Sequence, residues 1–310
     1  MYKVRSPILF LIFNRPKETQ VLFDAIREVR PNKLYVAADG PRNNGKDELI
    51  CQQTKDILNQ IDWDCELITL FREVNLGCGK AVSNAITWFF ELEEEGIILE
   101  DDCLPSIDFF RFCDDMLDYY RSNEKISHIC GCNFQDGLKR SDGDYYFSKL
   151  THVWGWASWR RVWNKYDFQM SHLEKAIESD VLSGLTLNKR YKEILYNAFT
   201  RTKNGEINTW DYQYLFLNQV NNHLSVIPNY NMISNIGFNS DGTHTLYLNS
   251  KMSNVAFDIF PDVIKHPKII FSDYIADNYT LKKEFKLNYK NLIFEFIYNI
   301  ISKIRYNGKM

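Results

Sequence analysis

The chain has 310 residues, of which 45% are hydrophobic and 25% charged, and its formal net charge is −3. This is the composition of a globular core, long enough for one large α/β domain or two small ones. No basic stripe dominates the first 280 residues, which argues against a nucleic-acid partner. The seven cysteines lack the paired spacing of a disulfide framework or a zinc ribbon, so we expect reduced thiols in a cytosolic protein.

Strand-like and helix-like segments alternate along the first 135 residues. The continuous apolar run PILFLIF predicts the first strand, and KLYVAA predicts a second strand that ends in a turn. We expect strands at 7–13, 33–38, 65–71, 96–99 and 126–131, and helices at 17–29, 47–60, 80–94 and 106–120. Ser106 is the expected N-cap of the last of these helices. This alternation predicts an α/β fold with a Rossmann-like, mostly parallel sheet and helices on both faces.

The strand at 96–99 ends without a linker in three acids, Glu100, Asp101 and Asp102. Like charges repel one another at the end of a buried strand, so a partner of opposite charge is needed to hold them there. Mg²⁺ or Mn²⁺ takes one or two protein carboxylates and completes its shell with water and substrate phosphate oxygens. The triplet therefore predicts metal-assisted chemistry on a phosphorylated substrate.

Ligands of parallel α/β sheets bind in the crevice at the carboxyl ends of the strands. The polar residues that follow the first four expected strands, and so share this rim, are Asn14, Arg15, Asp39, Arg72, Asn75, Glu100, Asp101 and Asp102. Together they offer cations and hydrogen-bonding groups for a nucleotide base and a diphosphate. The segment 75–80, which ends in Lys80, resembles a phosphate-binding loop only loosely. Neither GxGxxG nor GxxxxGK[ST] occurs, which disfavours dinucleotide cofactors and ordinary ATP hydrolysis.

Eight short segments follow one another in a characteristic order: LIFNRP, YVAADGP, NLGCGKAVSNAI, GIILEDDCLPSIDFF, HICGCNF, WGWASW, NTWDYQ and NIGFNSDGTHT. This order resembles bacterial nucleotide-diphosphate-sugar glycosyltransferases with the GT-A fold. Over the first three quarters of the chain it is also similar to the animal N-acetylglucosaminyltransferase I family of inverting, metal-dependent enzymes that use UDP-N-acetylglucosamine. The chain departs from that family in being shorter, and WGWASW has only a partial counterpart there.

The resemblance implies roles for individual residues of this chain. It implies that Asp102 is the direct metal ligand and that Arg15 and Asp39 contact the nucleotide base. It also implies that the Trp-Asp segment places Trp210 at the substrate and makes Asp211 the catalytic base. An acceptor hydroxyl loses its proton as it attacks, which calls for one such carboxylate. The residues alone leave an alternative, because an acid in the first turn also suits the dipole of a helix running from a cap at 208–209 to Val220.

Two further motifs contain candidate ligands. A helix could bury Trp156, Trp159 and Trp163 along one face as core residues. Trp154 and Gly155 are candidates for sugar contact, since indoles suit sugar faces and glycine permits close approach. In SDGTHT, His244 is a candidate ligand of the metal or the diphosphate, as related GT-A enzymes bring a C-terminal histidine there, and the alternative is a structural histidine.

The pattern changes after about residue 250. Residues 281–310 contain seven Lys or Arg against two Glu, and their apolar residues fall largely on one helical side. This predicts either an interfacial helix at an anionic membrane surface or a helix packed on protein. The apolar run at 8–13 is too short for a signal peptide, and no stretch approaches the roughly twenty apolar residues of a membrane span. We therefore expect a cytoplasmic protein, with the inner face of the cytoplasmic membrane as the site of any contact.

These observations predict a GT-A catalytic domain at 1–250 and an appendage with a basic amphipathic helix at 251–310. The expected activity is inverting, Mn²⁺- or Mg²⁺-dependent transfer of a sugar, such as N-acetylglucosamine, from a UDP-sugar to a hydroxyl of a bacterial glycan, lipid-linked or protein acceptor. One alternative is a sugar nucleotidyltransferase, although its GxGTR-like loop is missing after the first strand. Another is a non-catalytic, carbohydrate-binding or membrane-peripheral protein. The oligomeric state stays open.

Overall fold

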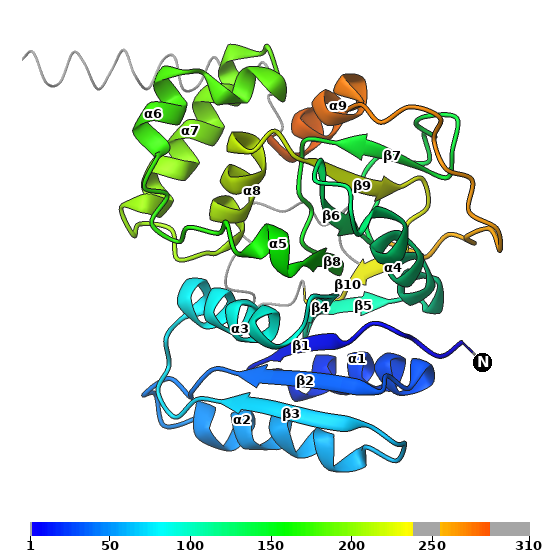
Figure 1. Ribbon diagram of the computed structural model, residues 1–310. Coiled ribbons are helices and arrows are strands. Elements are labelled where there is room, and N and C mark those ends of the chain that lie inside the picture. Colours follow the sequence, from blue (N-terminus) through cyan, green and yellow to red (C-terminus); the bar gives the residue numbers. More distant parts are fainter. Residues whose placement is uncertain (1, 238–254, 286–310) are drawn as a thin grey trace, which may run out of the picture.

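The computed structural model describes residues 2–237 and 255–285, which form a mixed α/β structure around a large sheet (Figure 1). The sheet has eight strands in the order β3-β2-β1-β4-β8-β6-β9-β7. Their bounds are β1 (Ile8–Ile12), β2 (Lys33–Ala38), β3 (Glu66–Phe71), β4 (Glu95–Glu100), β6 (Ile126–Cys130), β7 (Tyr145–Ser148), β8 (Trp156–Trp159) and β9 (Leu224–Pro228). A small second sheet pairs β5 (Cys103–Pro105) with β10 (Ile233–Asn235) in antiparallel fashion.

Most of the large sheet is parallel. β1 lies between β2 and β4 and is parallel to both, and β3 continues the parallel set beyond β2. β6 and β9 pair in parallel, whereas β8 runs antiparallel between β4 and β6, and β7 runs antiparallel at the edge beside β9. The predicted mostly parallel sheet is therefore confirmed.

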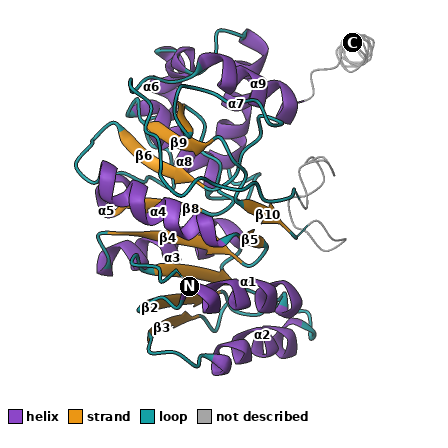
Figure 2. Ribbon diagram, turned by 90° about the vertical axis from the view of Figure 1, so that its right-hand side faces the viewer, coloured by secondary structure: helices purple, strands orange, loops and turns teal. Residues whose placement is uncertain are grey.

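Helices cover both faces of the sheet (Figure 2). On one face α1 (Pro16–Val29) contacts α2 (Asp47–Asp56), the short η1 (Ile57–Gln60) and α4 (Ile107–Tyr120). On the other face lies α3 (Cys78–Leu92), which contacts α5 (Arg160–Trp163). The predicted helices and strands of the first 135 residues are confirmed with ends within two residues, except that the helix expected at 47–60 is divided into α2 and the 3-10 turn η1. Ser106 occupies the N-cap position of α4, but its side chain makes no capping hydrogen bond.

The tryptophan-rich segment corrects one prediction. Trp156 and Trp159 lie in the strand β8, not on a helix with Trp163, which follows in the single turn of α5. β8 pairs with β4 on one side and β6 on the other, and every residue of it is buried. A strand buried on both faces shows no alternation, so its sequence could not be told from a helical segment. The prediction that these indoles are core residues is confirmed.

A second hydrophobic cluster lies beside the sheet and was not predicted. It is built by α6 (Leu173–Glu178), η2 (Val181–Gly184), α7 (Lys189–Lys203) and the outer side of α8 (Asp211–Val220). Asn188 caps α7 by accepting hydrogen bonds from the amides of Arg190 and Tyr191. Leu281 of α9 (Tyr274–Phe285) is fully buried in this cluster. The last described helix is therefore packed on the protein.

The expected C-terminal appendage is described only in part. Within 281–310, residues 281–285 close α9, and the remaining apolar and basic residues lie outside the described residues, as do the boundary at 250 and His244. No helix in the described ranges is long and apolar enough to cross a membrane.

Candidate functional site

The three acids at the end of β4 meet the residues that follow β1, because the two strands are paired in parallel. Asp101 is buried and accepts hydrogen bonds from the Phe13 amide (3.2 Å) and from Arg15 Nη1 (3.2 Å). The same Arg15 nitrogen donates to Asp102 Oδ2 at 2.7 Å. The thiol of Cys103 donates to Asp102 Oδ1 at 3.2 Å. Arg15 thus ties two acids of the triplet to the end of β1.

Negative charge exceeds positive charge at this strand end. The pKa of Glu100 is raised to about 8, chiefly by burial and then by the charges of Asp102, Asp101 and Asp211, while Arg15 acts to lower it. Burial likewise raises the pKa of Asp101 to about 7 against the lowering effect of Arg15. Among the described residues, the three carboxyl groups of Glu100, Asp101 and Asp102 therefore share the Arg15 guanidinium. Such a site favours a ligand that brings positive charge.

The donor set fits a hard divalent cation. Carboxylate oxygens suit Mg²⁺ and Mn²⁺, and Asp102 with Glu100 would supply one or two of them. In the described ranges no three His, Cys, Asp or Glu side chains are grouped closely enough to hold an ion by themselves. This agrees with a cation that takes its remaining ligands from water and substrate phosphates. The chain leaves the described part at Gly237, whose backbone lies against the Asp102 side chain.

Asp39, at the end of β2, holds the loop that leads into α3. Its carboxylate accepts hydrogen bonds from the backbone amides of Leu76 and Gly77, each at 3.0 Å. Asn75 Nδ2 fastens the other side of this loop by donating to the Gly40 carbonyl at 2.7 Å. Arg72 is half-buried beside Asp39, and burial lowers its pKa. The predicted contact of Asp39 with a nucleotide base stays a prediction.

Two other residues predicted for the nucleotide lie around the same rim. Asn14 follows β1 and its Nδ2 donates to Asp47 Oδ1 at 3.3 Å, at the start of α2. Lys80 is exposed in the first turn of α3. Neither position excludes a ligand contact, and both roles stay predictions.

Asp211 is the first residue of α8. The predicted cap by Asn208 and Thr209 is wrong, because Trp210 occupies the N-cap position and makes no side-chain cap. Thr209 Oγ1 instead donates to Asp211 Oδ1, which also accepts from the Tyr212 amide at 2.8 Å. The helix ends at Val220 as expected. Asp211 is half-buried and close enough to Glu100 to raise its pKa, so the structure brings the proposed base and the acid triplet together.

Asn208, just before α8, forms a hydrogen bond with the first turn of α3. Its Oδ1 accepts a hydrogen bond from the Gly79 amide at 3.0 Å. A Cβ at Gly77 or Gly79 would come within 2.8 Å of the Asn208 side chain, and Gly77 has a φ of +77°. The loop held by Asp39 and the residue three positions before Asp211 are therefore in direct contact.

Of the residues predicted to contact the sugar or the acceptor, Trp210 and Gly155 are buried and Trp154 is half-buried. Trp210 is 2% exposed and stacks on Trp156 with centroids 5.6 Å apart, so it packs in the core. Gly155, at φ +60°, is buried, and a Cβ there would meet Ile233 at 2.4 Å. Packing explains that glycine. Trp154 is half-buried with Phe134 against its ring at 5.4 Å.

Two residues that the sequence did not point to lie near the predicted ones. The charge of Asp211 acts on Glu284, and Cys103 contacts Asp102. Glu284 stands in a segment whose basic and apolar residues predicted a membrane-facing or packed helix, so nothing in the pattern distinguished it. Cys103 directly follows the acid triplet, and this position was the one available signal for its contact with Asp102.

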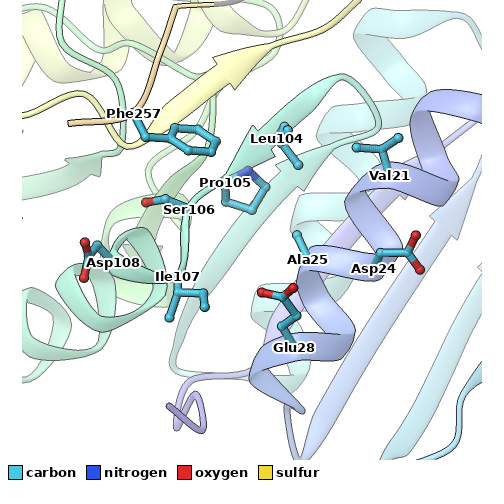
Figure 3. Close-up of a pocket in the computed structure, with 10 residues that line it drawn as sticks. All are labelled: Val21, Asp24, Ala25, Glu28, Leu104, Pro105, Ser106, Ile107, Asp108 and Phe257. Carbon is cyan, nitrogen blue, oxygen red and sulfur yellow. The ribbon is translucent and has the colours of Figure 1, made fainter. Parts of the chain in front are cut away.

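A pocket away from these residues lies between α1 and the junction of β5 with α4 (Figure 3). Its lining combines the acids Asp24, Glu28 and Asp108 with the apolar Val21, Ala25, Leu104, Pro105, Ile107 and Phe257, and with Ser106. None of the residues predicted for the site lines this pocket.

Fold and site together define an α/β protein with an acidic, arginine-bridged site at the carboxyl ends of β1 and β4. No protein-family model and no curated protein sequence matches the chain. Among solved structures it is similar to a mannosyltransferase from Pyrobaculum calidifontis in complex with GDP-Man and Mn²⁺ (11% identity, TM-score 0.39, 72% of this chain and 70% of that one). It is also similar to the inositol-1-phosphate CTP transferase from T. maritima (9%, 0.35, 58% and 84%). A third match is the glycosyltransferase GlyE of Streptococcus pneumoniae TIGR4 (9%, 0.31, 69% and 43%). Similarities at this level assign no function.

Proposed function

We propose that the protein is an inverting, Mn²⁺- or Mg²⁺-dependent glycosyltransferase that moves a sugar from a UDP-sugar to a hydroxyl of a glycan, lipid-linked or protein acceptor. One observation carries this proposal. Arg15, Glu100, Asp102 and Asp211 converge from the ends of β1 and β4 and the start of α8. The arrangement offers a cation site and a separate carboxylate within one site.

On the donor side, a bound Mn²⁺ or Mg²⁺ would act as a Lewis acid that stabilises the charge developing on the leaving diphosphate. Asp102 would hold it, with Glu100 as the nearby second carboxylate. Arg15 contributes a fixed positive charge that remains after the cation binds. Its position is set by two carboxylates, so little reorganisation is needed when a diphosphate arrives.

On the acceptor side, Asp211 would take the proton of the attacking hydroxyl. Thr209 and the Tyr212 amide both donate to Oδ1, and within the described residues no donor engages Oδ2. Oδ2 is therefore the oxygen available for an acceptor hydroxyl. General-base catalysis of this kind contributes a factor of about 10² to 10⁴.

The test is calorimetric titration of UDP, GDP and ADP into the protein with and without Mn²⁺. We expect UDP to bind in an Mn²⁺-dependent manner and Asp102→Ala to lose that dependence. Asp64→Ala, which removes an exposed carboxylate, is the matched control. Asp102→Ala binding UDP and Mn²⁺ as tightly as the parent would show that the triplet is not the metal site.

Product analysis separates the competing functions. Incubation with UDP-sugars and a carbohydrate acceptor should release UDP as the sugar is joined to an acceptor hydroxyl. Formation of pyrophosphate from UTP and a sugar 1-phosphate would instead identify a nucleotidyltransferase. Absence of nucleotide binding would leave the non-catalytic alternative.

A further inference from the structure

Glu284, in the last turn of α9, is a second acidic neighbour of Asp211. The pKa of Glu284 is raised to about 7, first by burial and second by the negative charge of Asp211. The Glu284 side chain is 25% exposed. A half-buried carboxyl group therefore lies within electrostatic reach of the proposed catalytic base, although the residues are far apart in sequence.

The position of Glu284 is fixed by the packing of α9. Gln135 Nε2 donates to the Ala276 carbonyl (3.2 Å) and to Thr280 Oγ1 (2.8 Å). Lys283 pairs with Asp136. The neighbouring lysine is thus engaged with another carboxylate, and the helix presents Glu284 at a defined place.

In the part of the chain that the structure describes, Glu284 makes no hydrogen bond to a side chain of opposite charge. Its closest polar neighbour is His152, whose Nδ1 lies 3.7 Å from Oε1, which is too long for a hydrogen bond. His152 is 8% exposed, and burial lowers its pKa to about 4, so the imidazole is neutral at pH 7. Among the described residues neither of these two side chains has a hydrogen-bond partner. A ligand with hydroxyl groups could offer hydrogen bonds to both side chains.

Aromatic rings adjoin this polar pair. Phe134 packs edge-on against the His152 ring with centroids 4.7 Å apart and against Trp154 at 5.4 Å. Tyr212 lies close enough to feel the charges of both Asp211 and Glu284. Aromatic side chains combined with a few polar groups are typical of small-molecule sites, and indoles suit the apolar faces of sugars.

We propose that Glu284 and His152, together with Trp154 and Phe134, form the acceptor subsite and bind the hydroxyl groups of a sugar unit beside Asp211. This inference rests on the proposed function and names its acceptor class as a carbohydrate. Glu284 accepts a hydrogen bond from one sugar hydroxyl, and His152 bonds a second. Asp211 then faces the hydroxyl that attacks.

Saturation-transfer NMR with four methyl glycosides tests the subsite. The probes are the methyl glycosides of glucose, galactose, mannose and N-acetylglucosamine, each titrated to 50 mM in the presence of UDP and Mn²⁺. We expect at least one glycoside to bind the parent protein. Glu284→Gln and Glu284→Ala should weaken that binding at least tenfold and leave the UDP affinity unchanged. Glu178→Gln, a change at an exposed carboxylate of α6, is the matched control and should behave as the parent.

The outcomes separate this inference from the proposed function. Unchanged glycoside binding in both Glu284 variants, or no binding of any glycoside by the parent, overturns the subsite. If the parent does not bind UDP but binds a glycoside in a manner that depends on Glu284, the proposed glycosyltransferase activity is wrong and a carbohydrate-binding site remains. Melting temperatures of the variants within a few degrees of the parent would establish that each is folded.

Discussion

The backbone of Gly237 lies directly against the side chain of Asp102. A Cβ at position 237 would come 2.4 Å from Asp102 Oδ2 and 2.6 Å from its Cβ. The neighbouring Ile236 amide donates to the Asp102 carbonyl at 2.8 Å. Ile236 and Gly237, the two residues after β10, therefore help to set the position of the proposed metal ligand.

Gly237→Ala should displace Asp102. The new Cβ would clash with the Cβ of Asp102, an atom that is fixed to the backbone and cannot swing away as the end of a flexible side chain could. We expect UDP affinity in the presence of Mn²⁺ to fall at least tenfold in calorimetry. Gly184→Ala is the control, since a Cβ there meets no atom within 4 Å. Parent-like affinity in Gly237→Ala would show that the position of Asp102 is not critical for binding.

Asp211→Asn keeps the shape of the side chain and removes the proton acceptor. If Asp211 acts as the base, transfer should fall by a factor on the order of 10² to 10⁴ while UDP and Mn²⁺ bind normally. The measurements are the rate of sugar transfer and calorimetric affinity. Retention of the rate would remove Asp211 from the mechanism, and retention of the donor's anomeric configuration in the product, seen by NMR, would remove inversion.

Thr209→Val removes the hydroxyl that donates to Asp211 Oδ1 and keeps the carboxylate. We expect a smaller loss of transfer than in Asp211→Asn, on the order of tenfold, because orientation is weakened and the base is retained. The comparison uses the same transfer assay. A loss as large as that of Asp211→Asn would indicate that Thr209 does more than orient the carboxylate.

Asp277 predicts a pH dependence of stability. It is buried, and burial raises its pKa to about 7, although Ser148 Oγ and the Lys149 amide donate to it. The folded state then holds a proton that the unfolded state releases near pH 4, so stability falls as the pH rises from about 4 to 7. Asp277→Asn should flatten this part of the curve, by about 2–4 kcal/mol across the window. Urea denaturation from pH 4 to 8 measures it, with Asp64→Asn as the exposed control.

The basic segment at 281–310 gives a prediction about lipid binding. Since Leu281 is buried and Glu284 lies beside Asp211, a truncation should follow Phe285. We expect the full chain to sediment with vesicles containing anionic lipid, less so at high salt, and the truncated chain to remain in solution. Equal sedimentation of both chains would favour the packed-helix alternative.

The parallel part of the fold was accessible from the sequence because its strands are continuous apolar runs and each ends at a polar residue. β1 and β4 show this pattern most clearly, and their pairing brought Arg15 to the acids as the strand-end rule predicts. β8 escaped prediction since its strand character comes from its two partners and not from local alternation. The cluster around α6 and α7 was not predicted, because no helix or strand was predicted between residues 166 and 207.

The site was predictable only where chain neighbours carry its chemistry. Glu100, Asp101 and Asp102 are adjacent in sequence, so their repulsion could be inferred directly. Glu284 reaches Asp211 only through the packing of α9 on β7 and on the Gln135 loop, which local pattern does not report. Asp39 lies at the expected strand end, but its hydrogen bonds to the amides of Leu76 and Gly77 could not be predicted from the sequence.

The contact of Asn208 with Gly77 and Gly79 has a consequence for how this chain can vary. A side chain at 77 would be strained at φ +77° and would meet Asn208, and a side chain at 79 would meet both Asn208 and the backbone carbonyl oxygen of Thr209 at 2.7 Å. A smaller residue at 208 would relieve neither the strain at 77 nor the backbone contact at 79, and it would withdraw the acceptor of the Gly79 amide, so glycine should be required at both positions. In a double-mutant cycle, substitutions at 79 and 208 should be non-additive, because the two residues share a hydrogen bond.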